Sequence, residues 1–322
     1  TYSGTWGAST ALTNAGMGVY TAGAFTWSAD GTYVVFSALN ATDSEQELYA
    51  VLASGADAAK TQAQLDSDGK KLTNLAYNVN NRRKWIDSDW SPSTCANGYQ
   101  DNIVSAMSRI INRSILGRDL FRISGAKTGG LYIESGGTPA TITQLTDLPG
   151  TSPGSMMPRW SHDCSKLAFV VMDGVGSPSK MSVYVMNLTD SVWAPVVAAF
   201  PVTALTAAGI YKIYECSAAS CPIGAAVYPS FSADNSALFL AVDTSKTVDI
   251  RGLQGNDITG AFYTGKNFDN YAIYIGVNGT YTSQKIGQSS SNEFGVTQCY
   301  GASCPNAASG KPITYVTQSS SA

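Results

Sequence analysis

Charged side chains are scarce in this chain of 322 residues. Asp, Glu, Lys and Arg make up 13% of the sequence, which is about half of their usual share in a soluble domain. The formal net charge is −3, so the chain lacks the basic field that draws a protein to nucleic acid or to an anionic membrane. We therefore expect no nucleic-acid partner.

The sequence also lacks long apolar runs. None reaches the length of about eighteen residues that a membrane-spanning helix needs. Neutral polar residues replace the missing charge, and the chain opens at Thr1 instead of a methionine. These features favour a processed protein that is secreted or held at the cell surface, with the periplasm as an alternative location.

Histidine is almost absent, which restricts the chemistry available. His162 is the only one, and it stands in the run Ser161-His162-Asp163. A serine triad also needs a nucleophile elbow, and no Gly-x-Ser-x-Gly occurs. We expect His162 to be a surface residue of a turn, and we assign no catalytic residue.

Cofactor motifs are missing as well. The sequence has no phosphate loop, no Gly-x-Gly-x-x-Gly and no haem-attachment motif, so no cofactor is expected. Asp66-Ser67-Asp68-Gly69 resembles the start of a calcium loop but lacks the later acidic ligands, including the closing Glu. A polar turn is the preferred interpretation, and calcium stays an alternative.

Other polar and aromatic residues are expected on loops. Arg82-Arg83-Lys84-Trp85 is predicted to be a solvated loop. Five tyrosines in predicted loops offer rigid contact area, which favours recognition over catalysis: Tyr211, Tyr214, Tyr263, Tyr271 and Tyr281. The acidic candidates for glycoside chemistry form no obvious pair: Asp87, Asp89, Asp173, Asp243 and Asp249.

Six cysteines indicate an oxidising compartment. Cys216 with Cys221, and Cys299 with Cys304, share a C-x4-C spacing that predicts two local disulfides; a four-cysteine zinc site is the alternative. Cys95 and Cys164 follow Trp90 and Trp160 at similar distances, so they are expected to pair across a repeat boundary if those tryptophans are equivalent. Four sequons permit glycosylation on exposed turns: Asn40, Asn112, Asn187 and Asn278.

An internal repeat organises the chain. Trp27-Ser28-x-Asp30, Trp160-Ser161-x-Asp163 and Phe231-Ser232-x-Asp234 share an aromatic-Ser-x-Asp pattern, and Trp90-Ser91 begins a weaker copy with Ser93 in place of Asp. The Asp is expected to bind a backbone N–H two residues on, and the following Gly31 or Asn235 tolerates positive φ. The Ser closes the turn, and the aromatic packs inward between repeats.

Two further landmarks keep the same order. Leu-Thr pairs occur at 12–13, 72–73, 145–146 and 205–206, and strands are predicted from Leu48, Leu120, Val183 and Ile273. They define repeats of approximately 12–71, 72–144, 145–204 and 205–287, with 288–322 as a partial unit that pairs with 1–11. The segment 94–125 is atypical, and the stretch from Val104 to Leu116 is an alternative short helix.

These motifs resemble the TolB-type (WD-like) β-propeller repeat family, most specifically at Pro158, Trp160, Ser161 and Asp163. The resemblance covers residues 10 to about 287. It implies an all-β fold in a single domain, 1–322, namely a β-propeller of four to five blades with enlarged inter-strand loops. The ring would be closed by the N-terminal strand or by a neighbouring subunit.

A binding or structural propeller outside the cell is the favoured function, including the form in which copies assemble into a surface layer or filament. Its expected partners are other protein subunits, above all copies of itself. Two alternatives stay open. One is a secreted hydrolase or lyase that acts on polysaccharide or peptide through the propeller loops, and the other is a periplasmic TolB-like scaffold.

Overall fold

We describe the fold from a computed structural model of the chain. The described residues are 11–14, 25–39, 46–73, 81–92, 95, 102–111, 114–124, 141–147, 154–173, 180–188, 196–197, 210–217, 227–243, 268–275, 281–286, 292–298 and 313–318. They form strands almost throughout, with one short helix.

The first two blades come from the N-terminal half of the chain. Blade 1 contains β1 (Thr26–Trp27), β2 (Tyr33–Leu39) and β3 (Gln46–Leu52). Blade 2 contains β4 (Asn81–Trp90), β5 (Ile103–Ile111), β6 (Ser114–Ser124) and β7 (Thr141–Gln144). Within each blade every strand pairs antiparallel with the next one.

The next two blades repeat this order. Blade 3 contains β9 (Gly154–Trp160), β10 (Lys166–Asp173), β11 (Lys180–Asn187) and β13 (Ile210–Ser217). Blade 4 contains β14 (Val227–Phe231), β15 (Ala237–Asp243), β16 (Phe268–Ile275) and β17 (Tyr281–Lys285). The short β8 (Thr146–Asp147) and β12 (Val196–Val197) pair parallel with each other.

A C-terminal hairpin follows blade 4. Its strands are β18 (Asn292–Gln298) and β19 (Ile313–Gln318), which pair antiparallel. The strand β18 packs against β14, β15 and β16 of blade 4. We call β18 and β19 the C-terminal unit.

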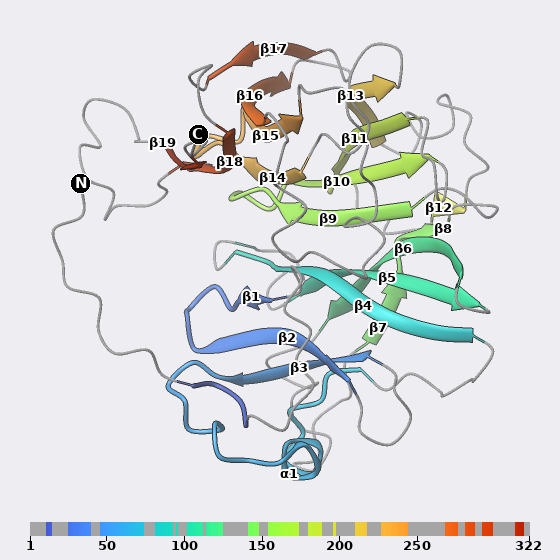
Figure 1. Cartoon of the computed structure of the whole chain (residues 1–322), viewed down its shortest axis with the longest axis vertical. Coiled ribbons are helices and arrows are strands. Elements are labelled where there is room, and N and C mark those ends of the chain that lie inside the picture. Colours follow the sequence, from blue (N-terminus) through green and yellow to red (C-terminus); the bar gives the residue numbers. More distant parts are fainter. Residues whose placement is uncertain are drawn as a thin grey trace, which may run out of the picture.

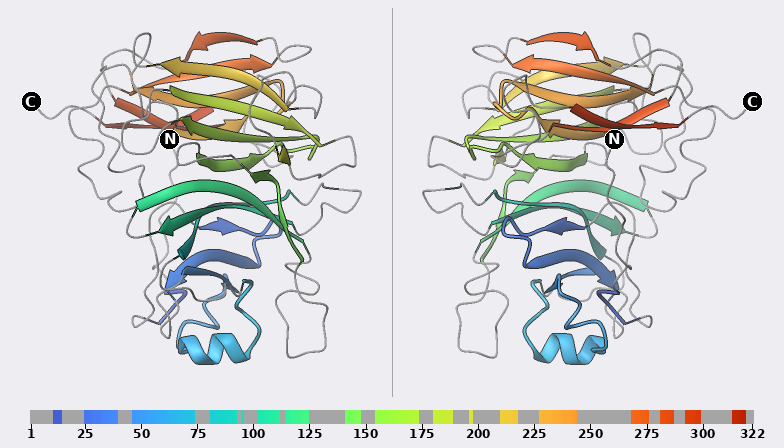
Figure 2. Two further views of the ribbon diagram at one scale, coloured as in Figure 1. Left: turned by 90° about the vertical axis from the view of Figure 1, so that its right-hand side faces the viewer. Right: turned by 90° about the vertical axis from the view of Figure 1, so that its left-hand side faces the viewer.

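The blades succeed one another in chain order across the molecule (Figure 1). The first strands of neighbouring blades lie side by side: β1 with β4, β4 with β9, β9 with β14, and β14 with β18. Figure 2 shows the same order from two sides, with blade 1 at one end and the C-terminal blades at the other. The described strands form four sheets, because single parallel pairings of β3 with β4 and of β6 with β9 join blades 1 to 3 into one sheet of eleven strands. None of these sheets closes on itself. The described part of the chain also contains no helix long and apolar enough to cross a bilayer.

One bulge recurs in the first strand of successive units. In β9, β14 and β18 one extra residue is inserted at the second or third position before the end of the strand, as the pairings around Met157, Tyr228 and Gly295 show. In β4 the extra residue is Asp87. Proline suits such a position because a bulge leaves an N–H unpaired, and Pro158 and Pro229 occupy it. The C-terminal unit therefore has the backbone register of the first two strands of a blade.

The two faces of a blade are distinguished by their pairings. Paired residues of antiparallel strands share a face, so Thr26 lies with Val35 on one face while Trp27 lies with Val34 on the other. The hydroxyl of Thr26 accepts a hydrogen bond from the Trp90 N–H of blade 2, at 3.3 Å. We call the face of Thr26 the downstream face, because it meets the following blade, and the face of Trp27 the upstream face.

A short helix covers part of the upstream face of blade 1. Helix α1 (Gln62–Ser67) begins with a capping box, in which the Thr61 hydroxyl accepts from the Gln64 N–H and the Gln64 side chain accepts from the Thr61 N–H. Its buried Leu65 joins a cluster with Phe36, Ala38, Tyr49 and Val51, and Leu12 packs on that same cluster. Figure 1 shows α1 at the edge of blade 1.

The outer edge of blade 1 is formed by residues 70–73. The N–H of Leu72 donates to the Leu48 carbonyl, and the Thr73 hydroxyl accepts from the Leu48 N–H. In blade 2, Leu145 directly follows the outer strand β7. The Leu-Thr pairs therefore end one blade instead of beginning the next. The N-terminal segment 1–11, which is predicted to pair with the partial unit 288–322, lies outside the described residues except for Ala11.

Several local predictions are wrong. The stretch from Val104 forms β5 and β6, not a helix, because its backbone finds strand partners on both sides. Arg82 to Trp85 lie in β4 and pair with β5 instead of forming a loop. Of the five tyrosines expected in loops, four lie in strands: Tyr211 and Tyr214 in β13, Tyr271 in β16, and Tyr281 in β17. Tyr263 lies outside the described residues.

The landmark strand of blade 4 is shifted by three residues from its predicted position. The residues that follow Leu48 and Val183 are Tyr49 and Tyr184. Tyr49 pairs with Phe36, which lies nine residues after Trp27, and Tyr184 pairs with Phe169, which lies nine residues after Trp160. At the same offset from Phe231, the register pairs Leu240 with Tyr271. Asn270-Tyr271, not Ile273-Tyr274, is therefore the equivalent pair.

The packing of α1 leads to a stability prediction. Replacing Leu65 with Ala is expected to lower the free energy of unfolding by about 2–5 kcal/mol, because it removes fully buried apolar volume from the upstream face of blade 1. Urea unfolding followed by circular dichroism measures the change. Ser67→Ala, at an exposed position of the same helix, is the matched control and is expected to change stability by less than about 0.5 kcal/mol. Equal effects of both substitutions would contradict the assigned role of Leu65.

Candidate functional site

The aromatic-Ser-x-Asp turns have one hydrogen-bond pattern in blades 1, 3 and 4. In blade 3 the Ser161 hydroxyl donates to Asp163 Oδ1 at 2.7 Å and accepts from the Lys166 N–H at 2.9 Å. Asp163 Oδ1 also accepts from the Ser165 N–H at 3.0 Å. Ser28 with Asp30 and Ser232 with Asp234 form the same bonds, with hydroxyl-to-carboxylate distances of 2.7 and 2.6 Å.

These bonds stabilise the ionised carboxylate. The hydroxyls of Ser232 and Ser236 and the Ser236 N–H hold the pKa of Asp234 at about 2. Each turn also binds the third strand of its own blade: Thr32, Ser165 and Ser236 accept through their carbonyls from the N–H groups of Ala53, Leu188 and Ile275. The Ser and Asp side chains therefore have a structural role: they stabilise the turn that connects the first two strands of each blade.

The weaker copy in blade 2 keeps the serine of the turn but has Ser93 in place of the aspartate. The Ser91 hydroxyl accepts from the Asn102 N–H, which lies 11 positions away, whereas Ser161 binds a residue 5 positions away. The turn of blade 2 is thus longer by 11 − 5 = 6 residues. Cys95 lies within this enlarged turn.

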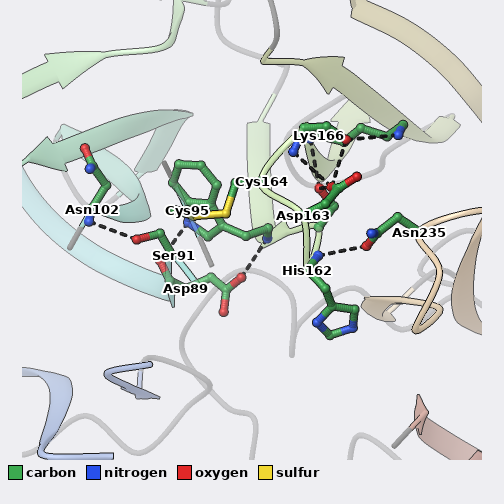
Figure 3. Close-up of a disulfide and its surroundings, with 12 residues drawn as sticks. Asp89, Ser91, Cys95, Asn102, His162, Asp163, Cys164, Lys166 and Asn235 are labelled. Carbon is green, nitrogen blue, oxygen red and sulfur yellow. Dashed lines mark hydrogen bonds between the residues drawn. A yellow bond between two sulfur atoms is a disulfide. The ribbon is translucent and has the colours of Figure 1, made fainter. Parts of the chain in front are cut away.

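A disulfide joins the enlarged turn to blade 3. Cys95 and Cys164 are bonded, with their Cα atoms 5.3 Å apart, and this is the pairing expected from their positions after Trp90 and Trp160 (Figure 3). Cys164 has a φ of 58°, at the turn position where blades 1 and 4 have Gly31 (70°) and Asn235 (61°). A left-handed conformation is uncommon for a residue with a side chain, and here the residue is a cysteine whose sulfur is bonded to the neighbouring blade.

The single histidine does not form a catalytic triad. Its backbone N–H donates to Asn235 Oδ1 of the next turn at 2.8 Å, so it links blades 3 and 4. Figure 3 shows the His162 ring turned away from the Asp163 carboxylate. His162 is half-buried beside the turn of blade 4.

A carboxylate lies at the boundary between blades 2 and 3. Asp89 Oδ2 accepts from the Trp160 N–H at 2.7 Å, and the Asp89 carbonyl accepts from the Trp160 indole N–H at 3.3 Å. Burial raises the pKa of Asp89 to about 6, although the nearby charge of Arg159 and the N–H groups of Trp160 and Trp90 act in the opposite direction. Asp89 is therefore an ionisable group inside the contact between two blades.

The motif aromatics do not all have the expected environment. Trp90 and Trp160 are each 4% exposed and Phe231 is 2% exposed, which fits packing between blades. Trp27, in contrast, is 54% exposed, and Phe25 just before β1 is 60% exposed. The expectation that every motif aromatic is buried is thus wrong for blade 1, because its upstream face has no preceding blade on it among the described strands.

The remaining predicted residues are only partly described. Cys216 lies in β13 and Asn187 ends β11, while Cys221, Cys299, Cys304, Asn40, Asn112 and Asn278 lie outside the described residues. Of the acidic candidates, Asp87 is in β4, Asp173 ends β10, Asp243 ends β15, and Asp249 lies outside.

The residues of the predicted calcium-like turn belong to the end of α1. Asp66 accepts from the Tyr49 hydroxyl at 2.9 Å, and Asp68 forms an ion pair with Lys60 at 2.6 Å. Gly69 follows with a φ of 65°. Within the described ranges no group of three or more His, Cys, Asp or Glu side chains is placed to hold a metal ion.

The class of fold follows from this geometry. The chain is mostly β and of propeller type, with antiparallel blades set side by side through their first strands, and none of the described sheets closes on itself. No family model matches the sequence. No curated protein matches it either.

Solved structures offer distant similarities. TolB from Acinetobacter baumannii is 13% identical, with a TM-score of 0.41, over 84% of this chain and 44% of that protein. A putative TolB from Agrobacterium tumefaciens is 14% identical, with a TM-score of 0.44, over 93% and 70% of the two chains. Hydrazine synthase from Kuenenia stuttgartiensis is 11% identical, with a TM-score of 0.38, over 86% and 70%. Because all three scores are below 0.5, they assign neither family nor function.

Removing a motif hydroxyl is expected to affect stability. Ser161→Ala leaves the Lys166 N–H without its acceptor and removes one of the donors to Asp163 at a buried serine, so it should lower the free energy of unfolding by about 1–3 kcal/mol. Ser165→Ala removes only a more exposed bond to the same carboxylate and should cost less than about 1 kcal/mol. Chemical denaturation of the two variants compares them. A larger loss in Ser165→Ala would refute the assignment.

Asp89 should give the stability a distinct pH dependence. An exposed aspartate ionises near pH 4, whereas folded Asp89 keeps its proton up to about pH 6, so the folded state binds more protons between these values. The contribution of Asp89 is therefore fully present below about pH 4 and is lost as the pH rises to about 6. We expect the difference in melting temperature between wild type and Asp89→Asn to shift in favour of the variant over this window. A difference in melting temperature between the two proteins that stays constant from pH 4 to 7 would contradict the prediction.

Proposed function

We propose that this chain is a non-catalytic propeller that acts outside the cytoplasm as a binding or structural module. Its proposed partners are protein subunits, including copies of the same chain. The architecture we infer has five blades, of which the C-terminal unit forms the first half of the fifth.

The bonding of the turn side chains supports this proposal most strongly. Ser161, His162 and Asp163 are the one run of residues in the sequence that suggests a serine hydrolase. Ser161 and Asp163 bind the turn backbone, as their counterparts do in blades 1 and 4, and the His162 backbone binds the next turn. A structural role explains the whole run.

The disulfide supports a location outside the cytoplasm. The bond between Cys95 and Cys164 closes a loop across 69 positions and joins two blades. Disulfides of this kind persist in oxidising compartments and are reduced in most cytosols. The low share of charged residues fits the same location.

The location and the lack of turnover can be tested together. Native material is alkylated at harvest, and peptide mass spectrometry is expected to recover Cys95 and Cys164 as a cross-linked pair. The same material is then assayed against panels of polysaccharides and peptides, with and without calcium, and no turnover is expected.

Two results would overturn the proposal. Alkylated, unpaired Cys95 and Cys164 in native material would exclude the oxidising location. Turnover of a polysaccharide or peptide that is lost when one acidic residue is replaced, with the fold intact by circular dichroism, would show an enzyme.

A further inference from the structure

The boundaries of blades 1 with 2 and of blades 2 with 3 share one hydrogen-bond arrangement. At the boundary of blades 1 and 2, Thr26 accepts from the Trp90 N–H, and at the boundary of blades 2 and 3, Asp89 accepts from the Trp160 N–H. In both, the acceptor is the side chain just before the motif aromatic of the upstream blade. The donor is the backbone of the buried motif aromatic of the downstream blade.

Among the described residues, blade 1 carries the downstream half of such a boundary with no upstream half placed against it. Trp27 occupies the strand position of Trp90 and Trp160 but is 54% exposed, and Phe25 beside it is 60% exposed. Leu65 and Leu12 cover a different part of this upstream face, around Phe36 and Tyr49. Two neighbouring aromatics thus remain on the surface at the inner end of the face, where an apolar contact is favourable.

The C-terminal unit carries the complementary half. The bulge and register of β18 place Gln298 at the position of Trp160 and Phe231, and Thr297 at the position just before it. Thr26 is the residue at that position in blade 1, where it accepts from Trp90. The fifth unit therefore has a threonine at the register position from which Thr26 and Asp89 bind the following blade.

We propose that the upstream face of blade 1, through Phe25 and Trp27, receives the C-terminal unit of a second copy of this chain. A second copy is favoured because, within one chain, β18 packs on β14, β15 and β16 of blade 4 while Trp27 stays exposed. This inference rests on the proposed function and identifies its partner and its contact surface. Because the two surfaces differ, association is head-to-tail, which produces rings or filaments instead of a symmetric dimer.

Analytical ultracentrifugation over a wide concentration range tests the surface. The wild type is expected to associate with rising concentration, and Trp27→Ser, alone or with Phe25→Ser, is expected to weaken association at least tenfold. Tyr274→Ser is the matched control, since it removes another exposed aromatic, 42% exposed, from β16 of blade 4 and should leave association unchanged. Circular dichroism and urea unfolding establish that each variant is folded.

Mixing two variants tests the head-to-tail arrangement. Thr297→Lys places a charge at the other half of the contact and should also stop self-association. A copy with Trp27→Ser keeps a working C-terminal unit, and a copy with Thr297→Lys keeps a working blade 1, so an equimolar mixture is expected to form dimers and nothing larger. A mixture that stays monomeric would refute the pairing of these two surfaces.

Other outcomes separate this inference from the proposed function. A wild type that is monomeric at every concentration, with Trp27→Ser lowering only its thermal stability, would show that the chain's own C-terminal unit covers Trp27, and would overturn the inference. Association that Trp27→Ser leaves intact would overturn it too. Neither result affects the proposed non-catalytic role, which fails only in the alkylation and turnover assays.

Discussion

The hydrogen bond between a motif serine and the aspartate two positions later underlies the blade geometry. It places the serine hydroxyl to accept the N–H that begins the second strand, as Ser161 does for Lys166, and it leaves the aspartate free to accept from the turn backbone. The position of the preceding aromatic is thereby fixed at the end of the first strand. The contact between neighbouring blades depends on that position, because a single sheet cannot bury both of its faces alone.

The boundaries between blades use different chemistry on this common geometry. Thr26 supplies a neutral hydroxyl to Trp90, Asp89 supplies a carboxylate to Trp160, and Asn235 supplies an amide to His162. The boundary of blades 2 and 3 also carries the Cys95–Cys164 disulfide, beside a carboxylate whose pKa is raised by burial. It is the described boundary that contains both a disulfide and a buried ionisable group.

Residues whose roles are local were largely predictable. The turn residues Ser161 and Asp163 bind groups that lie no more than five positions away in the sequence, so the spacing of the residues is enough to predict their role. The helix α1 was missed although Thr61 and Gln64 form a capping box that the sequence displays. The landmark of blade 4 was misplaced by three residues because Tyr271 and Tyr274 both fit an alternating pattern, and only the pairing of Leu240 with Tyr271 decides between them.

The sequence by itself determined the repeat, the turn chemistry and the cysteines that join blades 2 and 3, since each depends on side chains at fixed spacing. The tertiary structure decided which copies are covered. Trp27 and Trp160 stand in nearly the same local pattern, yet one is 54% and the other 4% exposed. The difference arises because blade 2 precedes Trp160, whereas no described strand precedes Trp27. Burial by a neighbour is a property of the assembled fold that no local pattern encodes.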